Sequence, residues 1–219
     1  MPVRLPALLA PVLPSVARER GIPLRLEQSP GVALTFDDGP HPEGTPAILE
    51  LLESHGASAT FFLFGEQVLA QPSLAARIAA SGHAIALHCH RHRLQLRLSE
   101  RQLEDDLQRA RAAIEDATGA SLIWHRPPYG VYSAAGLTVA CQNGLRPLLW
   151  SRWGKDWRKF TTPSRIAARA TRKVAAGDVI LLHDADFYSA SGSHRRTAAA
   201  LPAVLGELSR RRLATVLPL

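Results

Sequence analysis

The alternation of short apolar runs with helix-like segments is the feature of this chain that most constrains its fold. Seven runs have the length and composition of buried strands, at residues 32–36, 60–64, 84–88, 122–126, 147–150, 178–182 and 214–217. Strands that alternate with helices predict βαβ units and a mostly parallel sheet. Because the runs are apolar nearly throughout, both faces of that sheet are expected to be covered.

The helix-like segments between the runs have recognisable ends. Thr45 before Pro46 predicts the N-cap of a helix that Gly56 ends. Ser99 and Gln102 predict a capping box at the start of a longer helix. Further helices are expected over residues 71–81, 133–143, 162–177 and 197–212. Seven such units could form an open sheet or curl into a barrel, and the periodicity does not choose between them.

Composition narrows the class of protein. The chain has 219 residues, of which 46% are hydrophobic and 21% charged, so it can bury a core as one or at most two domains. This excludes a disordered, collagen-like or multi-span membrane protein. Two cysteines are too few for a disulfide scaffold or a four-cysteine zinc site. A Cys89–Cys141 disulfide remains open, although we expect Cys141 to be a small buried side chain on its helix.

Positive charge predominates, with a formal net charge of +7. Eight Lys and Arg side chains fall within residues 152–173, and three arginines follow at 210–212. These residues could be a solvated helix face, or they could attract an anionic polymer. A nucleic-acid partner would rest on charge alone, because no nucleic-acid-binding motif is present, and none is predicted.

The N-terminal segment is treated separately. Its apolar stretch over residues 5–17 follows Arg4 and contains three prolines. It loosely resembles a secretory signal, but about 13 residues are too few to span a bilayer as a helix, and no transmembrane segment is expected. The alternative is a proline-broken lead-in that packs on the domain. We therefore divide the chain into a lead-in over 1–30 and a catalytic domain over 31–219.

Polar side chains gather where the predicted strands end. Ligands of parallel α/β folds bind at the carboxyl ends of the strands, so side chains at these positions are candidates for function. Five polar clusters occur there: residues 35–40, 88–92, 126–130, 156–157 and 183–184. Their concentration on one rim predicts a single site.

A metal centre is one possibility for that site. His88 and His92 are four residues apart, so both imidazoles point the same way if the segment is helical or tightly turned. Two histidines and one carboxylate make an open site for zinc or another divalent cation. His90 lies between the two, and we expect it to face substrate or solvent.

The adjacent Asp37 and Asp38 support this interpretation. Two neighbouring carboxylates repel each other, and burying both is costly unless each charge is neutralised. A metal on Asp38 and an arginine, Arg126, on Asp37 would meet that need. The alternative is an ordinary turn in which Gly39 and Pro40 follow the strand.

The five clusters resemble, in order and spacing, the five motifs of the polysaccharide deacetylases, the NodB-homology family or carbohydrate esterase family 4. The resemblance covers about residues 31–217. It implies a single-domain distorted (β/α)7 barrel and metal-dependent removal of N-acetyl groups from glycans that contain N-acetylglucosamine: peptidoglycan, chitin oligomers or poly-N-acetylglucosamine. It also implies that a divalent metal is bound. Zn²⁺ is the metal we expect, and Co²⁺, Mn²⁺ and Ni²⁺ are the alternatives.

The resemblance also assigns roles around the metal. Asp38, His88 and His92 correspond to the metal ligands. Asp37 corresponds to the general base that takes a proton from the attacking water. Arg126 corresponds to the residue that orients Asp37.

Five further positions correspond to groups that act on the substrate. His183 corresponds to the general acid for the leaving amine, and Asp156 to its tether. The backbone N–H of Tyr129 corresponds to an oxyanion donor, and the Tyr129 side chain lies in the substrate-binding part of the motif. Trp157 and Leu181 correspond to walls of the pocket that receives the acetyl methyl group.

Other functions remain open on the sequence. Cys89 stands where the family has Ser or Thr, and Arg93 stands where Pro commonly follows the second histidine. Related folds hydrolyse small cyclic amides or sugar O-acetyl esters, and a catalytically silent carbohydrate-binding relative is a further alternative. An anionic cell-wall polymer is a possible glycan partner. A glycan substrate favours an extracytoplasmic or cell-envelope location, whereas the weak signal-like segment favours the cytoplasm.

Overall fold

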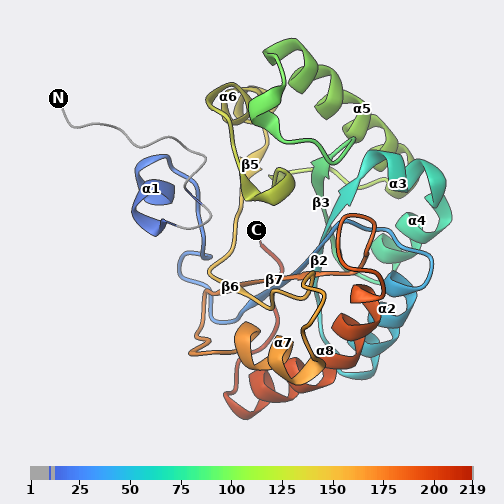
Figure 1. The fold of residues 1–219 in the computed structure, drawn as a ribbon, viewed down its shortest axis with the longest axis vertical. Helices are drawn as coiled ribbons and strands as arrows, with labels where there is room; N and C mark the ends of the chain where they lie inside the picture. The colour runs from blue at the N-terminus through green and yellow to red at the C-terminus, as the bar shows by residue number, and fades with distance from the viewer. Residues whose placement is uncertain (1–9, 11–12, 219) are drawn as a thin grey trace.

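A curled parallel sheet with helices along its outer side forms the body of the protein (Figure 1). The computed structural model describes residue 10 and residues 13–218. Seven strands pair in the order β5-β4-β3-β2-β1-β7-β6, and every pairing is parallel. The predicted distorted (β/α)7 barrel is therefore confirmed.

Long strands form the middle of the sheet, and short strands its edges. The strands are β1 (Ala33–Asp37), β2 (Thr60–Phe64), β3 (Ala84–Cys89), β4 (Trp124–His125), β5 (Arg146–Pro147), β6 (Arg152–Trp153) and β7 (Val179–His183). All residues of β1 and β2 are buried, as continuous apolar runs predict.

The prediction of a strand over residues 214–217 was wrong. Thr215 makes only an isolated parallel bridge to Val32, and the seventh strand is β6 instead. The pattern missed β6 because it consists of two half-buried residues, an arginine and a tryptophan, at a sheet edge.

Most helices follow the sequence pattern within a few residues, but the helix expected over 162–177 ends at Ala170, and the short helices at Pro14–Glu19 and Gly65–Ala70 were not expected. They are α1 (Pro14–Glu19), α2 (Gly44–Ser54), α3 (Gly65–Ala70), α4 (Pro72–Ala80), α5 (Glu100–Thr118), α6 (Ala134–Gln142), α7 (Pro163–Ala170) and α8 (Ser193–Arg210), with short 3₁₀ turns at Gln95–Arg97 and Pro128–Gly130. The capping box of Ser99 with Gln102 is confirmed. Thr45 is not the N-cap of α2, because Glu43 takes that position and the Thr45 hydroxyl donates to Asp184 instead.

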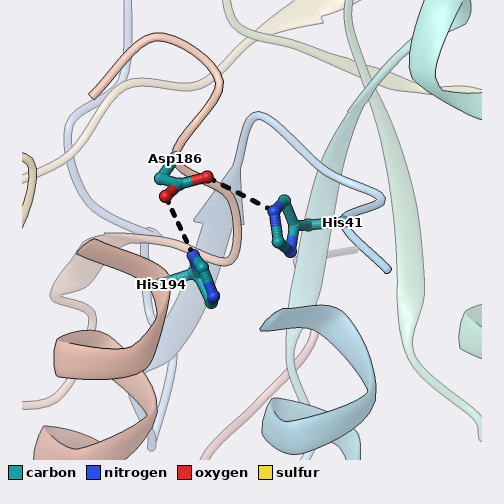
Figure 2. Close-up of side chains that lie close together, drawn as sticks. All are labelled: His41, Asp186 and His194. Atoms are coloured by element: carbon teal, nitrogen blue, oxygen red, sulfur yellow. Dashed lines mark ion pairs between the residues drawn. The ribbon is translucent and has the colours of Figure 1, made fainter. Parts of the chain in front are cut away.

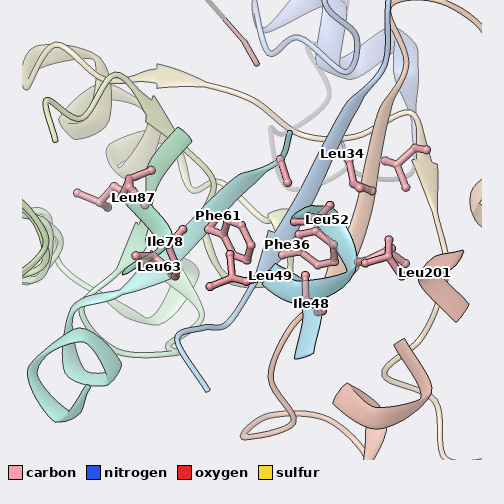
Figure 3. Close-up of a cluster of buried hydrophobic side chains, with 14 of the residues drawn as sticks. Leu34, Phe36, Ile48, Leu49, Leu52, Phe61, Leu63, Ile78, Leu87 and Leu201 are labelled. Atoms are coloured by element: carbon pink, nitrogen blue, oxygen red, sulfur yellow. The ribbon is translucent and has the colours of Figure 1, made fainter. Parts of the chain in front are cut away.

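The main core lies between the outer face of the sheet and the helices. Figure 3 shows Phe36 of β1 and Phe61 of β2 beside Ile48 and Leu52 of α2. The rings of Phe36 and Phe61 stack with centroids 5.2 Å apart. Burying each large apolar side chain contributes about 1.5–3 kcal/mol, so this layer fixes the strands whose ends carry the site.

A second cluster covers the inner face of the sheet. It includes Phe62 and Leu181 from the strands and Ala17 and Ile22 from the N-terminal segment. The described part of that segment thus packs on the domain. The rest of the signal-like stretch falls on residues 1–9 and 11–12, outside the described residues. Within the described residues, no helix combines the length and apolarity needed to cross a membrane.

The two cysteines are not paired. Cys89 is buried and Cys141 is exposed, and both are free thiols. The disulfide left open by the sequence is therefore absent, and the prediction that Cys141 is buried was wrong.

Candidate active site

The ends of β1, β3 and β7 bring the candidate catalytic side chains to one edge of the sheet. Asp37 is the register partner of His183 in the pairing of β1 with β7. Asp38 follows β1 directly and has a left-handed backbone with φ of 80°. That conformation is costly for a residue with a side chain, and such strain is typical of functional sites.

A fully buried arginine holds Asp37 in place. The Arg126 side chain is 0% exposed, and its Nη1 donates to an Asp37 carboxylate oxygen at 2.6 Å and to the Thr35 hydroxyl at 2.9 Å. Its Nε and Nη2 donate to the carbonyls of Leu148 and Leu149, each at 2.9 Å. Because Arg126 is bonded on all sides, the direction of its bond to Asp37 is fixed.

His88 has the tautomer that a metal ligand needs. Its Nδ1 lies within hydrogen-bond distance of the carbonyl oxygen of Arg126. A carbonyl only accepts, so Nδ1 carries the proton, and Nε2 keeps its lone pair in the neutral ring. That Nε2 lies 3.5 Å from a carboxylate oxygen of Asp38. Two acceptors that face each other in a buried place require a cation between them, either a proton or a metal ion.

The charge around Asp38 favours its ionised form. Burial by itself would raise the pKa of Asp38. When a proton rather than a metal ion lies between the two groups, His88 donates a hydrogen bond to Asp38. That bond and the nearby His183, His88 and His92 rings outweigh burial and lower the pKa of Asp38 below its usual value. An ionised carboxylate is the form that binds a metal.

His92 lies in the loop after β3, where the chain bends at residues 90–91, so of the two expected arrangements, helix or tight turn, the helix is not found. Its ring centroid is 6.5 Å from that of His88. Burial lowers the pKa of His92 to about 4. The ring is therefore neutral at ordinary pH and can offer a lone pair.

These residues fit the metal that the family implies. Asp38 and His88 face each other, and the His92 ring centroid lies 6.5 Å from that of His88. Two imidazoles and one carboxylate are the donor types of open divalent-metal sites. The fit rests on the His88 tautomer, because the hydrogen bond to Arg126 leaves its other nitrogen free for a cation.

His183 and Asp156 form a hydrogen-bonded pair. His183 Nδ1 lies 2.9 Å from one Asp156 oxygen, and the His183 backbone N–H donates to the other at 2.7 Å. The Thr197 hydroxyl also donates to Asp156. Burial would lower the pKa of His183, but Asp156, with smaller contributions from Asp38 and Asp37, raises it to about 10. The imidazole is thus held protonated, as a proton donor requires.

Two of the predicted substrate-binding residues, Trp157 and Tyr129, contact side chains of this centre. Trp157 contacts the His183 ring edge-on at 5.5 Å, and Leu181 is buried in the inner cluster. The Tyr129 side chain is 60% exposed, and its backbone is left-handed with φ of 62°. Among the described residues no hydrogen bond from the Tyr129 backbone N–H is found, so this donor is available to a ligand.

Neither Cys89 nor His90 joins the candidate metal ligands. Burial raises the pKa of the Cys89 thiol well above its usual value, so the metal-binding thiolate form is disfavoured. The His90 backbone N–H donates to Asp106, and its Nδ1 is buried without a partner in the described part of the chain.

Sequence reasoning missed a second group of side chains on the same rim. His41, Asp186 and His194 lie with their ligand atoms within 4.8 Å of one another. Figure 2 shows the Asp186 carboxylate between the two rings. One oxygen lies 3.3 Å from His41 Nε2 and the other 3.2 Å from His194 Nδ1. These residues belong to no motif that the sequence singled out, and only the fold brings them together.

The hydrogen bonds of His41 set this group apart from the His88 site. His41 Nδ1 accepts from the backbone N–H groups of Glu43 and Gly44, at 3.2 and 2.9 Å, at the start of α2. The proton of the neutral ring is therefore on Nε2, the atom that faces Asp186. A nitrogen that carries a proton cannot bind a metal, so we interpret the group as a polar contact between the Asp186 carboxylate and two imidazoles, named here the Asp186 clasp.

Comparisons with known proteins agree with the fold and the site. Residues 27–148 match the family model of polysaccharide deacetylases. A chitooligosaccharide deacetylase of Azorhizobium caulinodans is 36% identical over 188 residues, which cover 82% of this chain and 89% of that protein. A peptidoglycan-N-acetylglucosamine deacetylase of Bacillus cereus is 35% identical over 182 residues, which cover 82% of each chain.

Solved structures show the same relationship. The Bc1960 peptidoglycan N-acetylglucosamine deacetylase superposes with a TM-score of 0.81 and 29% identity, covering 88% of this chain and 87% of that one. The fold and these relatives thus define a hydrolase of the carbohydrate esterase family 4 type. The chain belongs to the polysaccharide deacetylase family, a metal-dependent family that includes the chitooligosaccharide and peptidoglycan N-deacetylases named above.

Proposed function

We propose that this chain removes N-acetyl groups from a glycan that contains N-acetylglucosamine, with Asp38, His88 and His92 as metal ligands. The observation that carries the proposal is the His88 tautomer, which directs a free lone pair at the Asp38 carboxylate. A divalent cation bound there supplies Lewis acidity and makes a water molecule easier to deprotonate.

The side chains around that position supply the remaining steps. Asp37, oriented by Arg126, takes a proton from the attacking water. The Tyr129 backbone N–H stabilises the negative oxygen that develops on the amide, and a donor of this kind contributes about 2.7–4 kcal/mol. His183, held protonated by Asp156, gives a proton to the nitrogen of the leaving amine. Trp157 and Leu181 are assigned to the walls of the acetyl pocket.

Zn²⁺ is the metal we propose. Two imidazoles and one carboxylate suit zinc, and Co²⁺, Mn²⁺ or Ni²⁺ can use the same donors. Elemental analysis of the protein purified without added metal tests this assignment. Zinc at one equivalent supports it, and another metal at that level contradicts it.

The substrate class follows from the relatives. The two named above act on chitooligosaccharides and on peptidoglycan N-acetylglucosamine. The net charge of +7 supports an anionic cell-wall glycan such as peptidoglycan. The positive charge of the Lys- and Arg-rich segment over residues 152–173 is partly neutralised, because Arg152 pairs with the buried Asp178.

Acetate release from N-acetylated chitooligosaccharides and from peptidoglycan tests the proposal, with an O-acetylated sugar as a third substrate. We expect Asp37→Asn to lower kcat by about 10²–10⁴-fold, because the base is lost while the metal ligands remain. Metal content should be unchanged in this variant. Equal rates for Asp37→Asn and the parent would contradict the role of Asp37.

A silent relative is the rival interpretation. A carbohydrate esterase family 4 pseudoenzyme of Bacillus anthracis has the same fold, with a TM-score of 0.77 and 27% identity. The intact arrangement of Asp37, Arg126, Asp156 and His183 favours activity here. Absence of acetate from all three substrates with the metal bound would support the silent relative.

A further inference from the structure

Tyr188 lies against the proposed metal ligand His92, although it belongs to none of the five motifs. The two rings are stacked, with centroids 4.1 Å apart and an interplanar angle of 19°. Tyr188 comes from the loop between β7 and α8 and remains 40% exposed. It therefore covers one face of His92 from the solvent side.

His92 needs such a contact more than His88 does. A metal-binding histidine is usually oriented by a hydrogen bond from its second ring nitrogen. His88 has this bond, to the carbonyl of Arg126. Within the described residues, no hydrogen bond joins the His92 ring to another residue, and the one that affects its pKa is with its own backbone. Its surroundings are aromatic instead: besides Tyr188, the Tyr129 ring meets it edge-on at 4.6 Å and the Phe64 ring lies 5.5 Å away.

Tyr188 itself is held at two points. Its hydroxyl donates to a carboxylate oxygen of Glu66 at 2.5 Å, at the start of α3. Its ring also packs edge-on against Phe64, 5.5 Å between centroids. The stacking partner of His92 is thus connected to the β2–α3 corner as well as to its own loop.

The Asp186 clasp fixes the loop that carries Tyr188. Asp186 is two residues before Tyr188, and its carboxylate lies between His41 and His194 (Figure 2). It also accepts from the Gly192 backbone N–H at 2.7 Å, across the loop. The clasp therefore joins the loop to the β1–α2 segment and to the first turn of α8.

We propose that Tyr188 is a positioning residue that orients His92 for metal binding, and that the Asp186 clasp holds Tyr188 against it. This inference rests on the proposed function, because it takes His92 as a ligand. Stacking restricts rotation of the imidazole in the metal-free protein. Less conformational entropy is therefore lost when the metal binds. Loss of a group that orients a ligand typically costs about 10–100-fold in metal affinity.

Metal binding to the apoprotein tests the proposal directly. Zn²⁺ is titrated into the parent and into Tyr188→Leu, Tyr188→Phe and Phe160→Ala, and the visible spectrum of the Co²⁺-loaded form is recorded for each. Phe160 is an aromatic side chain that is 84% exposed, so it is the matched control. We expect about tenfold weaker Zn²⁺ binding and an altered Co²⁺ spectrum for Tyr188→Leu. Tyr188→Phe keeps the ring and should restore both, and Phe160→Ala should match the parent.

Parental Zn²⁺ affinity and an unchanged Co²⁺ spectrum in Tyr188→Leu would overturn the inference, even with a raised KM, because Tyr188 would then act on substrate alone. Asp38→Ala separates this result from failure of the proposed site. If Asp38→Ala abolishes Zn²⁺ binding while Tyr188→Leu does not weaken it, the site stands and the positioning role is wrong. If Asp38→Ala binds Zn²⁺ as the parent does, the proposed metal site is wrong and the inference is wrong with it.

Discussion

The direction of one hydrogen bond distinguishes two imidazoles that look alike in the sequence. His88 donates from Nδ1 to a carbonyl, and its Nε2 is free for a cation. His41 accepts at Nδ1 from two backbone N–H groups, and its Nε2 carries a proton. Each ring lies beside a carboxylate, so proximity alone would assign both to a metal. The donor or acceptor on the far side of the ring decides which assignment is chemically possible.

The pair of His183 and Asp156 predicts a shift in the pH dependence of activity. Burial lowers the pKa of His183, and Asp156 more than reverses this, to about 10. We expect Asp156→Asn to lower that pKa, so the alkaline limb of the kcat/KM profile moves to lower pH. Rates measured from pH 6 to about 11 on a chitooligosaccharide test the shift. An alkaline limb in the same position would remove His183 from the role of general acid.

The same pair affects stability. The folded pKa of His183 lies above its unfolded value of 6.5, so its contribution to stability is fully present below about pH 6.5. It is lost as the pH rises through about 10. The difference in unfolding free energy between the parent and Asp156→Asn should therefore shrink over that interval.

At this scale the sequence predicts which residues act but not how they are held. The motifs identify Asp37, Arg126 and His183 as candidate site residues, because carboxylates, arginines and histidines at strand ends can carry charge or transfer protons. The contact of Tyr188 with His92 could not be predicted, because it joins residues 96 positions apart through a loop without a periodic pattern.

At the scale of the element, length and burial decide what could be predicted. The strand over 60–64 agrees with β2 residue for residue, since four apolar residues after Thr60 fill a fully buried strand. β6 was not predicted, because a two-residue edge strand is too short to show a periodic pattern of apolar side chains. The start of α2 was misjudged because Thr45 can cap a helix or bond across the fold, and its bond to Asp184 is a tertiary contact.

Close packing of α2 against the β7–α8 loop predicts that Gly44 tolerates no side chain. A Cβ at Gly44 would lie 1.9 Å from the Asp184 carbonyl oxygen and 2.9 Å from His194 Cβ. We expect Gly44→Ala to lower the free energy of unfolding by about 1–3 kcal/mol. Gly206 of α8 is the control, because its Cβ would meet nothing within 4 Å. Gly206→Ala should stabilise by up to about 1 kcal/mol in urea unfolding. Equal effects of both substitutions would contradict this packing argument.

For the whole molecule, the sheet order explains why ligands distant in sequence converge. Asp38 follows β1 and His88 is the second-last residue of β3, with β2 between these strands. A cation bound there would join two segments that are 50 residues apart in the sequence. The buried hydrogen bonds of Arg126 also join distant segments, because they connect it to β1 and to the carbonyls of residues 148 and 149. Strand–helix alternation alone predicts a common rim, but the curl of the sheet decides which strand ends meet.

This convergence predicts that the metal stabilises the fold, and the effect distinguishes the two histidine groups. A ligand that binds only the folded state at 100 times its Kd adds about 2.7 kcal/mol, so Zn²⁺ should raise the Tm of the apoprotein. His88→Ala should abolish the rise, because the lone pair facing Asp38 is lost. His194→Ala should reduce the rise without abolishing it, because it loosens the Asp186 clasp that holds Tyr188 against His92 but removes none of the proposed metal ligands. Thermal unfolding of the three proteins with and without Zn²⁺ makes the comparison. The reverse pattern, with the rise in Tm lost in His194→Ala and kept in His88→Ala, would show that the cation binds at the Asp186 clasp. That result would contradict the assignment of the metal ligands.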